Sequence, residues 1–470
     1  MGRWISSRRT HLTGLGGLAL ALGTTAAPGA AAPPEPGADP AAVADWHATT
    51  VATVVTDAGK ATAEAFLWYA FAQAAVYNAV VGITGRYALY KWDVRGPAGA
   101  APEAAAAAAA NRVLLTSFGH LPAARARLGD AYAAALGRVP DGAAKAQGVR
   151  YGERAADRMV ALRVDDGRFA PVTFDTPLAP GVWRPTPAAR APFFAPWLAR
   201  LRPLLLTPEG QTLDWSTYNA DPRVHGAPRN PDGTVRADGP GWPLAFRPAG
   251  PPALTSAAYA ADLNEVQALG GKTSARRTPA QTETGLFFSQ VLIVPLQTAL
   301  RDLVTERRLD ISDSARLLAA ADLSAADAVT SCWDAKLHCG FWRPVTAVRL
   351  AAEDGNPATE ADPAWEPLID TPPYPDYSSN LCSVFGAVAR AVAGVLGTDA
   401  IGLPLASPAT RTTRRYATAA GLCQDAVDAR VWAGVHFRFA DVDGMARGTQ
   451  IGDWALAHYF RPLATPAGAT

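Results

Sequence analysis

Residues 334–344 read Asp-Ala-Lys-Leu-His-Cys-Gly-Phe-Trp-Arg-Pro, and this stretch decides the fold. Lys336 and Arg343 stand seven residues apart, about two turns of a helix with 3.6 residues per turn, so a continuous helix would project both cations from one face. The flanking aromatic residues indicate a half-buried face, where an unpaired cation is costly. Two such cations predict a bound anion, although most Lys/Arg pairs form only a solvated basic stripe.

Downstream, residues 372–380 read Pro-Pro-Tyr-Pro-Asp-Tyr-Ser-Ser-Asn, and apolar residues then follow at helical spacing. Serine and asparagine are preferred N-cap residues, so a helix is predicted to open at Ser378 to Asn380 and to run to Leu396. The free N–H groups and the positive dipole end of such a helix favour an oxyanion. An ordinary helix cap is the alternative interpretation.

A third stretch, residues 430–441, reads Arg-Val-Trp-Ala-Gly-Val-His-Phe-Arg-Phe-Ala-Asp. Six residues rotate a continuous helix by about 600°, so Arg430 and His436 would diverge by roughly 120° unless the helix ends between them. Gly434 is well placed to end it, and both side chains could then meet at one site. Taken alone, a single histidine is more often a packed or surface residue.

Together the three stretches gather three cations, a serine hydroxyl, helix-terminal amides and one imidazole. Charge-assisted donors hold an oxyanion, and the imidazole can bind its central atom. The joint pattern therefore predicts a pocket for a tetrahedral or trigonal bipyramidal oxyanion.

The remaining sequence is mostly helical in its periodicity. Helices are predicted at 41–81, 103–116, 123–136, 143–162, 256–269, 279–301, 313–350 (broken near Leu323 and Ser324), 380–396, 407–433 and 444–459. No stretch alternates with period two for long, so no strand is predicted. Trp183, Phe193, Phe194 and Trp197 lie in a proline-rich stretch, where they would either line a substrate mouth or anchor an irregular chain.

We therefore predict an all-α fold of two packed helical bundles, with the oxyanion pocket in the C-terminal bundle. The predicted organisation is a signal peptide over 1–32, an N-terminal helical bundle over 41–163, an ordered proline-rich connection over 164–250 and a C-terminal helical domain over 251–462.

The 43 Lys and Arg and the 42 Asp and Glu nearly cancel, so no global field favours nucleic acid or an acidic membrane. No HExxH motif or histidine cluster suggests zinc hydrolysis. The four cysteines match no zinc pattern, and they could form one or two disulfides or remain buried thiols.

The N-terminus indicates export. Arg3, Arg8 and Arg9 precede an apolar stretch from Leu12 to Leu22, which is too short for a membrane span of about 20 residues. Residues 7–12 are similar to a twin-arginine signal, and an ordinary signal with two chance arginines is the alternative. We predict a secreted protein with no stable membrane insertion, whose mature chain starts near Pro33.

The three stretches resemble the K-x6-RP, PSGH and SR-x5-H motifs of the vanadium-dependent haloperoxidases and of the acid phosphatases in the type 2 phosphatidic acid phosphatase superfamily. Residues 183–187, 259–284 and 434–438 are similar to the bacterial secreted branch. The resemblance implies vanadate, or phosphate in its place, as cofactor. The side chains implied to hold it are Lys336, Arg343, Ser379, Asn380, Arg430 and His436.

By this resemblance His436 is the catalytic residue and the ligand of the vanadium in vanadate. The implied activity is peroxide-dependent oxidation of halide, with peroxide, halide and an organic small molecule as partners. One alternative is a secreted acid phosphatase in which His436 is the nucleophile. The other is a catalytically silent homologue that still binds an oxyanion.

The sequence departs from the motifs at the second histidine, the acid/base of the PSGH stretch, which is Leu381 here. General acid–base help is typically worth about 10² to 10⁴ in rate, so turnover should be weakened unless His338 or Asp376 substitutes. The serine before the motif arginine is Ala429. The acid that often follows the ligand histidine by four residues stands one position later, at Asp441, so its support of the imidazole is an open question.

Overall fold

The computed structural model describes residues 38–463 except 61, 188, 207–245 and 291. The described residues form one compact unit. The predicted signal segment, with Arg8 and Arg9, lies outside the described residues, so export and the start of the mature chain near Pro33 stay predictions.

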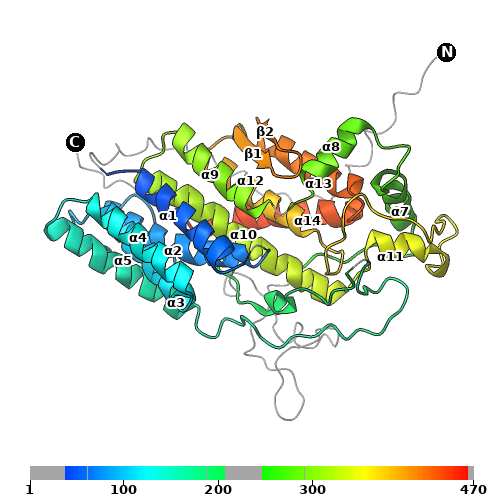
Figure 1. Cartoon of the computed structure of the whole chain (residues 1–470), viewed down its shortest axis with the longest axis horizontal. Helices are drawn as coiled ribbons and strands as arrows, with labels where there is room; N and C mark the ends of the chain where they lie inside the picture. The colour runs from blue at the N-terminus through cyan, green and yellow to red at the C-terminus, as the bar shows by residue number, and fades with distance from the viewer. Residues whose placement is uncertain (1–37, 61, 188, 207–245, 291, 464–470) are drawn as a thin grey trace, which may run out of the picture. The chain divides into compact units, whose positions relative to one another are not determined.

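The protein is mostly helical, which confirms the predicted fold class (Figure 1). The helices are α1 (Ala41–Ala52), α2 (Ala65–Thr84), α3 (Pro102–Phe118), α4 (Pro122–Gly137), α5 (Ala143–Leu162), α7 (Ala257–Gly270), α8 (Pro279–Phe287), α9 (Ile293–Glu306), α10 (Ile311–Cys339), α11 (Pro344–Arg349), α12 (Asn380–Leu396), α13 (Ala419–Trp432) and α14 (Arg438–His458). Shorter turns are a π-helix at Thr53–Asp57 and 3₁₀ helices at Pro196–Arg200 and Ala351–Glu353.

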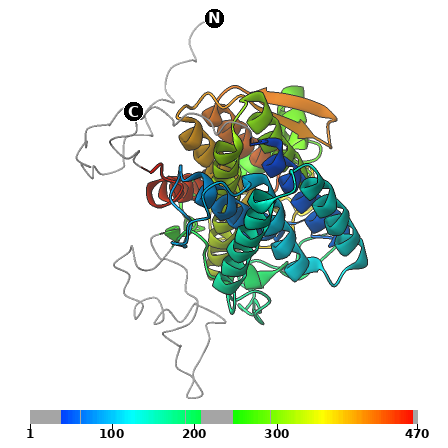
Figure 2. The ribbon, with the colours of Figure 1, turned by 90° about the vertical axis from the view of Figure 1, so that its left-hand side faces the viewer.

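Helix α10 joins the two halves of the fold. It packs against α2 of the first bundle and against α12 and α14 of the second, and it passes between the two groups in both views (Figures 1 and 2). The predicted break near Leu323 and Ser324 is wrong, because both residues lie fully buried within one uninterrupted helix. A serine costs a helix only a few tenths of a kcal/mol, which close packing of the surrounding alanines outweighs.

Three other predicted helices differ from the structure. The segment 41–81 forms α1, the π-helix at Thr53–Asp57 and α2, which begins only at Ala65, instead of one helix. The segment 279–301 forms two helices, α8 and α9, instead of one. The predicted helix 407–433 begins only at Ala419, because strands β1 (Leu403–Ser407) and β2 (Thr412–Tyr416) form an antiparallel hairpin before it. Leu403, Leu405 and Ser407 are buried in alternation, so a period-two pattern is present but spans only five residues.

Helices α12 and α14 cross at close range. A Cβ on Gly448 of α14 would lie 2.0 Å from the Ser383 carbonyl oxygen of α12, and one on Gly444 would lie 2.5 Å from that of Ser379. Glycine at these positions lets the two backbones touch. This contact fixes the first turn of α12, where the candidate pocket lies.

The proline-rich connection is irregular over residues 164–206 and 246–250, apart from the 3₁₀ turn, and residues 207–245 lie outside the described part. The buried Asp327 carboxylate of α10 accepts the backbone N–H groups of Leu204, Leu205 and Leu206 at 2.7, 2.8 and 3.0 Å. Trp183 and Phe193 are buried in the core. Trp183 and Phe193 are therefore anchors, whereas Phe194 lines the cavity described below.

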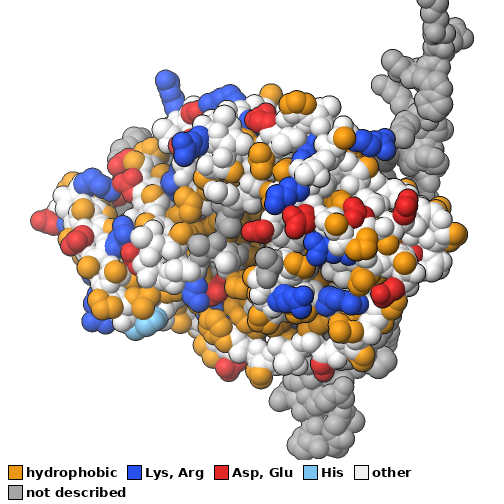
Figure 3. All heavy atoms as spheres, turned by 45° about the vertical axis from the view of Figure 1, so that its right-hand side comes forward, with side chains coloured by type: hydrophobic (Ala, Val, Ile, Leu, Met, Phe, Trp, Pro, Cys, Tyr) orange, Lys and Arg blue, Asp and Glu red, His pale blue; other side chains and the backbone are white. Residues whose placement is uncertain are grey.

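Helix α2 is long and apolar enough to cross a membrane, but 94% of its apolar stretch is buried inside the protein. On the face drawn in Figure 3, acidic and basic side chains are intermixed. Cys332, Cys339, Cys382 and Cys423 form no disulfide in the described part of the chain. Of the two possibilities left open by the sequence, the structure therefore has thiols and not disulfides.

Candidate oxyanion pocket

The predicted site residues come from four helix ends. Lys336 lies in the last turn of α10, and Arg343 is the N-cap of α11. Ser379 is the N-cap of α12, Arg430 lies in the last turn of α13, and His436 follows it in the connection to α14. All five are buried, with at most 6% of the side chain exposed. Asn380, the first residue of α12, is half-buried.

Lys336 and Arg343 meet, but not along one helix as the spacing predicts. Helix α10 ends at Cys339, and Gly340 reverses the chain with a φ of +54° in the left-handed region that glycine tolerates. The two cations converge instead on the Tyr374 ring, with Lys336 Nζ 4.9 Å and Arg343 Cζ 4.8 Å from its centroid. The two cations therefore do not share one helical face, and the chain reversal at Gly340 brings them together instead.

Lys336 directs its ammonium group at the loop before α12. Nζ donates to the carbonyl oxygens of Pro375, Asp376 and Ser378 at 2.7, 2.9 and 2.6 Å. An ammonium group has three protons, so these bonds use every donor it has. Burial lowers the pKa of Lys336 to about 8. Lys336 thus holds the loop in place and contributes charge to the site.

The two arginines keep donors available. Arg343 Nε donates to the Tyr374 carbonyl at 2.8 Å and Nη1 to the Val435 carbonyl at 2.6 Å, while Nη2 has no hydrogen-bond partner among the described residues. Arg430 Nη1 donates to the Phe288 carbonyl at 3.1 Å, and its Nε likewise lacks a partner in the described structure. Buried guanidinium donors without partners are costly, which favours an acceptor that they share.

His436 can meet Arg430 because the helix ends where Gly434 predicts. Helix α13 stops at Trp432, and Gly434 has a φ of +77°. A Cβ at Gly434 would also lie 2.4 Å from the Gly270 carbonyl oxygen, so no other residue fits. The chain then turns His436 back toward the cavity that Arg430 also lines.

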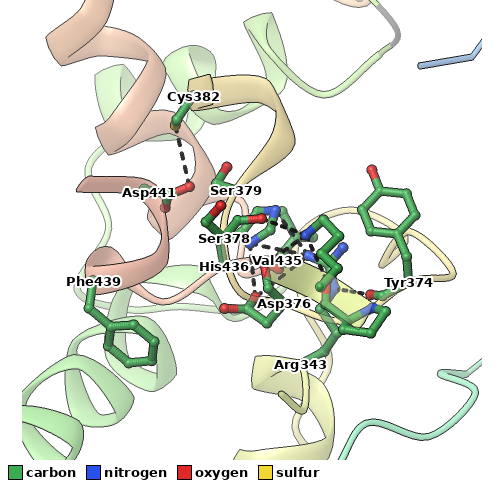
Figure 4. Close-up of polar contacts among 12 residues, drawn as sticks. Arg343, Tyr374, Asp376, Ser378, Ser379, Cys382, Val435, His436, Phe439 and Asp441 are labelled. Atoms are coloured by element: carbon green, nitrogen blue, oxygen red, sulfur yellow. Dashed lines mark hydrogen bonds and ion pairs between the residues drawn. The ribbon is translucent and has the colours of Figure 1, made fainter. Parts of the chain in front are cut away.

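The imidazole of His436 is held between Asp376 and Arg343 (Figure 4). Nδ1 lies 2.9 Å from Asp376 Oδ1, and Nε2 lies 3.0 Å from Arg343 Nη1. The carboxylate lies on the Nδ1 side of the ring, and Nε2 faces the Arg343 guanidinium, which can only donate, so an electrophile bound at Nε2 would have to take the place of that donor. Burial, followed by the charges of Arg343, Lys336 and Arg430, lowers the pKa of His436 well below its usual value, so the ring is neutral.

The carboxylate beside His436 is Asp376, which the sequence suggested only as a replacement proton donor. Asp441 instead places Oδ1 3.4 Å from Cys382 Sγ and lies next to Ser379 (Figure 4). Burial raises the pKa of Asp376 to about 7, against the opposing effect of Arg343 and Lys336. Burial also raises the pKa of Asp441 well above its usual value. The contact of Asp376 with His436 spans 60 residues, and no sequence spacing signals it.

A cavity of about 320 Å³ opens above these residues. At one end it is lined by Asn380, Arg430 and His436, and Leu381 lies beside them. Its other walls are mainly apolar and include Phe66, Phe194, Phe288, Leu292, Ile293, Leu296, Trp333, Tyr374, Val384 and Phe385. Lys336, Arg343 and Ser379 are fully buried and are not among the residues that line this cavity. The cavity therefore joins an apolar chamber to a cationic end at the start of α12.

Comparison with known proteins supports the resemblance. The family model of the VCPO second helical-bundle domain matches residues 316–465. Vanadium chloroperoxidase from Curvularia inaequalis is 32% identical over 178 residues, which cover 31% of this chain and 29% of that protein. Residues 316–465 are therefore similar to the second helical bundle of vanadium chloroperoxidase.

Solved structures of bacterial haloperoxidases share the fold. The first bacterial vanadium-dependent iodoperoxidase aligns with a TM-score of 0.69 and 19% identity over 91% of this chain and 98% of that one. A holo-type bacterial vanadium-dependent chloroperoxidase aligns with a TM-score of 0.60 and 16% identity over 85% and 92% of the two chains. At these identities the likeness concerns the fold alone. The alignment with the Curvularia enzyme spans less than a third of that enzyme's length.

Proposed function

We propose that the pocket at the start of α12 binds vanadate, or phosphate in its place, and that the loaded protein carries out a weakened peroxide-dependent oxidation of halide. The observation that carries this proposal is the convergence of Arg343, Arg430 and His436, with two guanidinium nitrogens unpartnered among the described residues. The relationship to vanadium haloperoxidases supports the same chemistry.

Each residue has a role that follows from its contacts. Arg343 and Arg430 would neutralise oxygens of the guest, and the amide of Asn380 would donate from the positive end of α12. His436 would offer its Nε2 lone pair to the central atom. Lys336 would hold the loop before α12 and add positive charge. Vanadate, when bound, would supply the Lewis-acidic centre at which peroxide oxidises halide.

Proton transfer is the weak step. Of the described residues that line the cavity, Tyr374, Arg430 and His436 carry ionisable side chains, and burial raises the pKa of Tyr374 above its usual value. His436 would already bind the central atom of the oxyanion, so it would not transfer the proton. Asp376 and His338 do not line the cavity. With Leu381 at the acid/base position, we expect turnover to be lower than with a histidine there by about 10² to 10⁴.

The test loads the purified full chain with vanadate, removes free ions and measures retained vanadium and phosphate. Bromination of an activated diketone and hydrolysis of a chromogenic phosphate ester are then measured side by side. Retained vanadium with slow bromination supports the proposal. Hydrolysis without bromination would identify a phosphatase, and retention without turnover a silent oxyanion-binding protein.

A variant pair separates specific binding from adsorption. Arg430→Met removes a cavity cation of roughly the same length, while Arg438→Met removes a half-exposed arginine that pairs with Glu265 and Asp428. We expect vanadate binding to fall at least about tenfold in the first variant and to stay within about twofold in the second. Absence of vanadate and phosphate binding in the wild-type chain would end the proposal.

A further inference from the structure

Asp376 places a carboxylate inside the group of cations that is proposed to bind the guest. Its side chain is fully buried, with Oδ1 2.9 Å from His436 Nδ1 and 3.6 Å from Arg343 Nη1. The same guanidinium nitrogen lies 3.0 Å from His436 Nε2, the atom that would meet the guest. Asp376 therefore interacts with the same two side chains on which the guest depends.

The charges around Asp376 come from every element packed against it. The groups that face it are Lys336 of α10, Arg343 before α11, Arg430 of α13, the neutral His436, the backbone N–H of Phe437 and the Asp441 carboxylate of α14. Three cations thus stand against two buried carboxylates. At a pH above the Asp376 pKa of about 7, its charge of −1 beside the cations repels an added anion, and the repulsion doubles for a dianion.

We propose that Asp376 is a resident anion of the pocket that sets its charge preference, weakening the binding of doubly charged oxyanions relative to singly charged ones of the same shape. This inference rests on the proposed oxyanion function and assigns the residue that limits it. Asp376 acts on the guest through its field and through Arg343 and His436. Its replacement by a neutral residue should therefore tighten binding, which a merely structural role would not do.

The experiment compares sulfate with perchlorate, two tetrahedral oxyanions that differ by one charge. Calorimetry at one fixed pH above 7, where the Asp376 carboxylate is charged, measures both affinities in the wild-type chain and in Asp376→Asn. We expect the substitution to raise the perchlorate affinity roughly tenfold and the sulfate affinity roughly 100-fold, because the Coulomb energy scales with the guest's charge. Phosphate binding is measured in the same samples.

Asp322→Asn is the matched control. Asp322 is also fully buried beside a histidine, His47, at 3.2 Å. It lies 14 residues before Lys336 on α10, which is about 21 Å along the helix. This distance exceeds the Debye length of about 8 Å at physiological ionic strength. We expect this variant to leave both anion affinities within about twofold.

The outcomes separate the two ideas. Equal gains for both anions, or no gain, in Asp376→Asn would overturn the role of Asp376 while leaving the oxyanion pocket intact. Absence of phosphate, sulfate and perchlorate binding in every variant would instead remove the proposed function. If Asp376→Asn does not fold, Asp376→Ala carries the same expectation. A wild-type chain that binds sulfate about tenfold more tightly than perchlorate also contradicts the inference.

Discussion

Leu381 stands where the PSGH motif has its proton-donating histidine, and its side chain is apolar. Its side chain lines the cavity next to Asn380, Arg430 and His436, so a histidine at this position would face the same guest. We expect Leu381→His to raise the latent turnover, bromination or hydrolysis, by about 10² to 10⁴, which is the usual value of general acid–base help. The steady-state rate of bromination by the vanadate-loaded protein and that of phosphate-ester hydrolysis by the protein free of vanadate and phosphate measure this effect.

Leu381→Gln is the control for polarity. Glutamine is polar and donates hydrogen bonds, but its amide does not transfer a proton near neutral pH. It should therefore leave the rate within about threefold of the wild type. A similar gain in both variants would show that polarity, and not proton transfer, limits the reaction. No change in either would show that the missing histidine is not the limiting feature.

At the residue scale, the spacing of motifs identified the side chains that converge but not how they interact. Lys336 and Arg343 were found from a helical spacing that the structure does not keep, since the chain reverses at Gly340. The three carbonyl partners of Lys336 belong to a loop about 40 residues away. Such contacts depend on how the loop packs, which local periodicity does not encode.

At the element scale, strong signals predicted helix ends well. Helix α12 has the predicted bounds, from its start at Asn380 to Leu396, because a clear apolar stripe runs between Ser379 and Gly397, although the Ser379 side chain makes no capping hydrogen bond. The hairpin at 403–416 was missed because its two strands have five residues each and only one of them alternates in burial. Short strands that pack on a helical core carry too few residues to establish a period.

The crossing of α12 and α14 yields a prediction for helix packing. Gly448→Ala places a Cβ 2.0 Å from the Ser383 carbonyl oxygen, so the helices must separate. Overpacking of this kind typically costs about 1–3 kcal/mol, and we expect a loss of unfolding free energy in that range. Because the same contact positions the first turn of α12, oxyanion affinity should fall as well. Denaturant titration and calorimetry measure the two effects.

Gly129→Ala is the matched control, because Gly129 lies in the interior of α4 and a Cβ there would meet nothing within 4 Å. Alanine relieves the entropic cost of glycine in a helix by about 0.5–1 kcal/mol, so this variant should be more stable than the wild type. The same substitution is thus expected to have opposite signs at the two sites. Equal effects would mean that the α12–α14 contact is not as close as described.

At the scale of the whole molecule, α10 makes the two bundles depend on each other. Most of its residues are buried, and it packs against α2 on one side and α12 and α14 on the other. One cluster of buried apolar residues extends from α1 to α14. The boundaries 41–163, 164–250 and 251–462 therefore stay predictions about sequence organisation, while the described residues pack as one unit.

This shared helix predicts that the two bundles unfold together. Loss of either bundle would expose one side of α10, and burial is worth about 25 cal/mol for each Å² of apolar surface, so a half-folded state should be strongly disfavoured. Hydrogen exchange across a denaturant series should show α3 and α12 losing protection at one midpoint. Gly448→Ala, although it lies in the second bundle, should lower both midpoints equally. If α12 opened at lower denaturant while α3 kept its protection, α10 would have to be stable with one side uncovered, and the oxyanion pocket would then belong to a bundle that unfolds independently of the first.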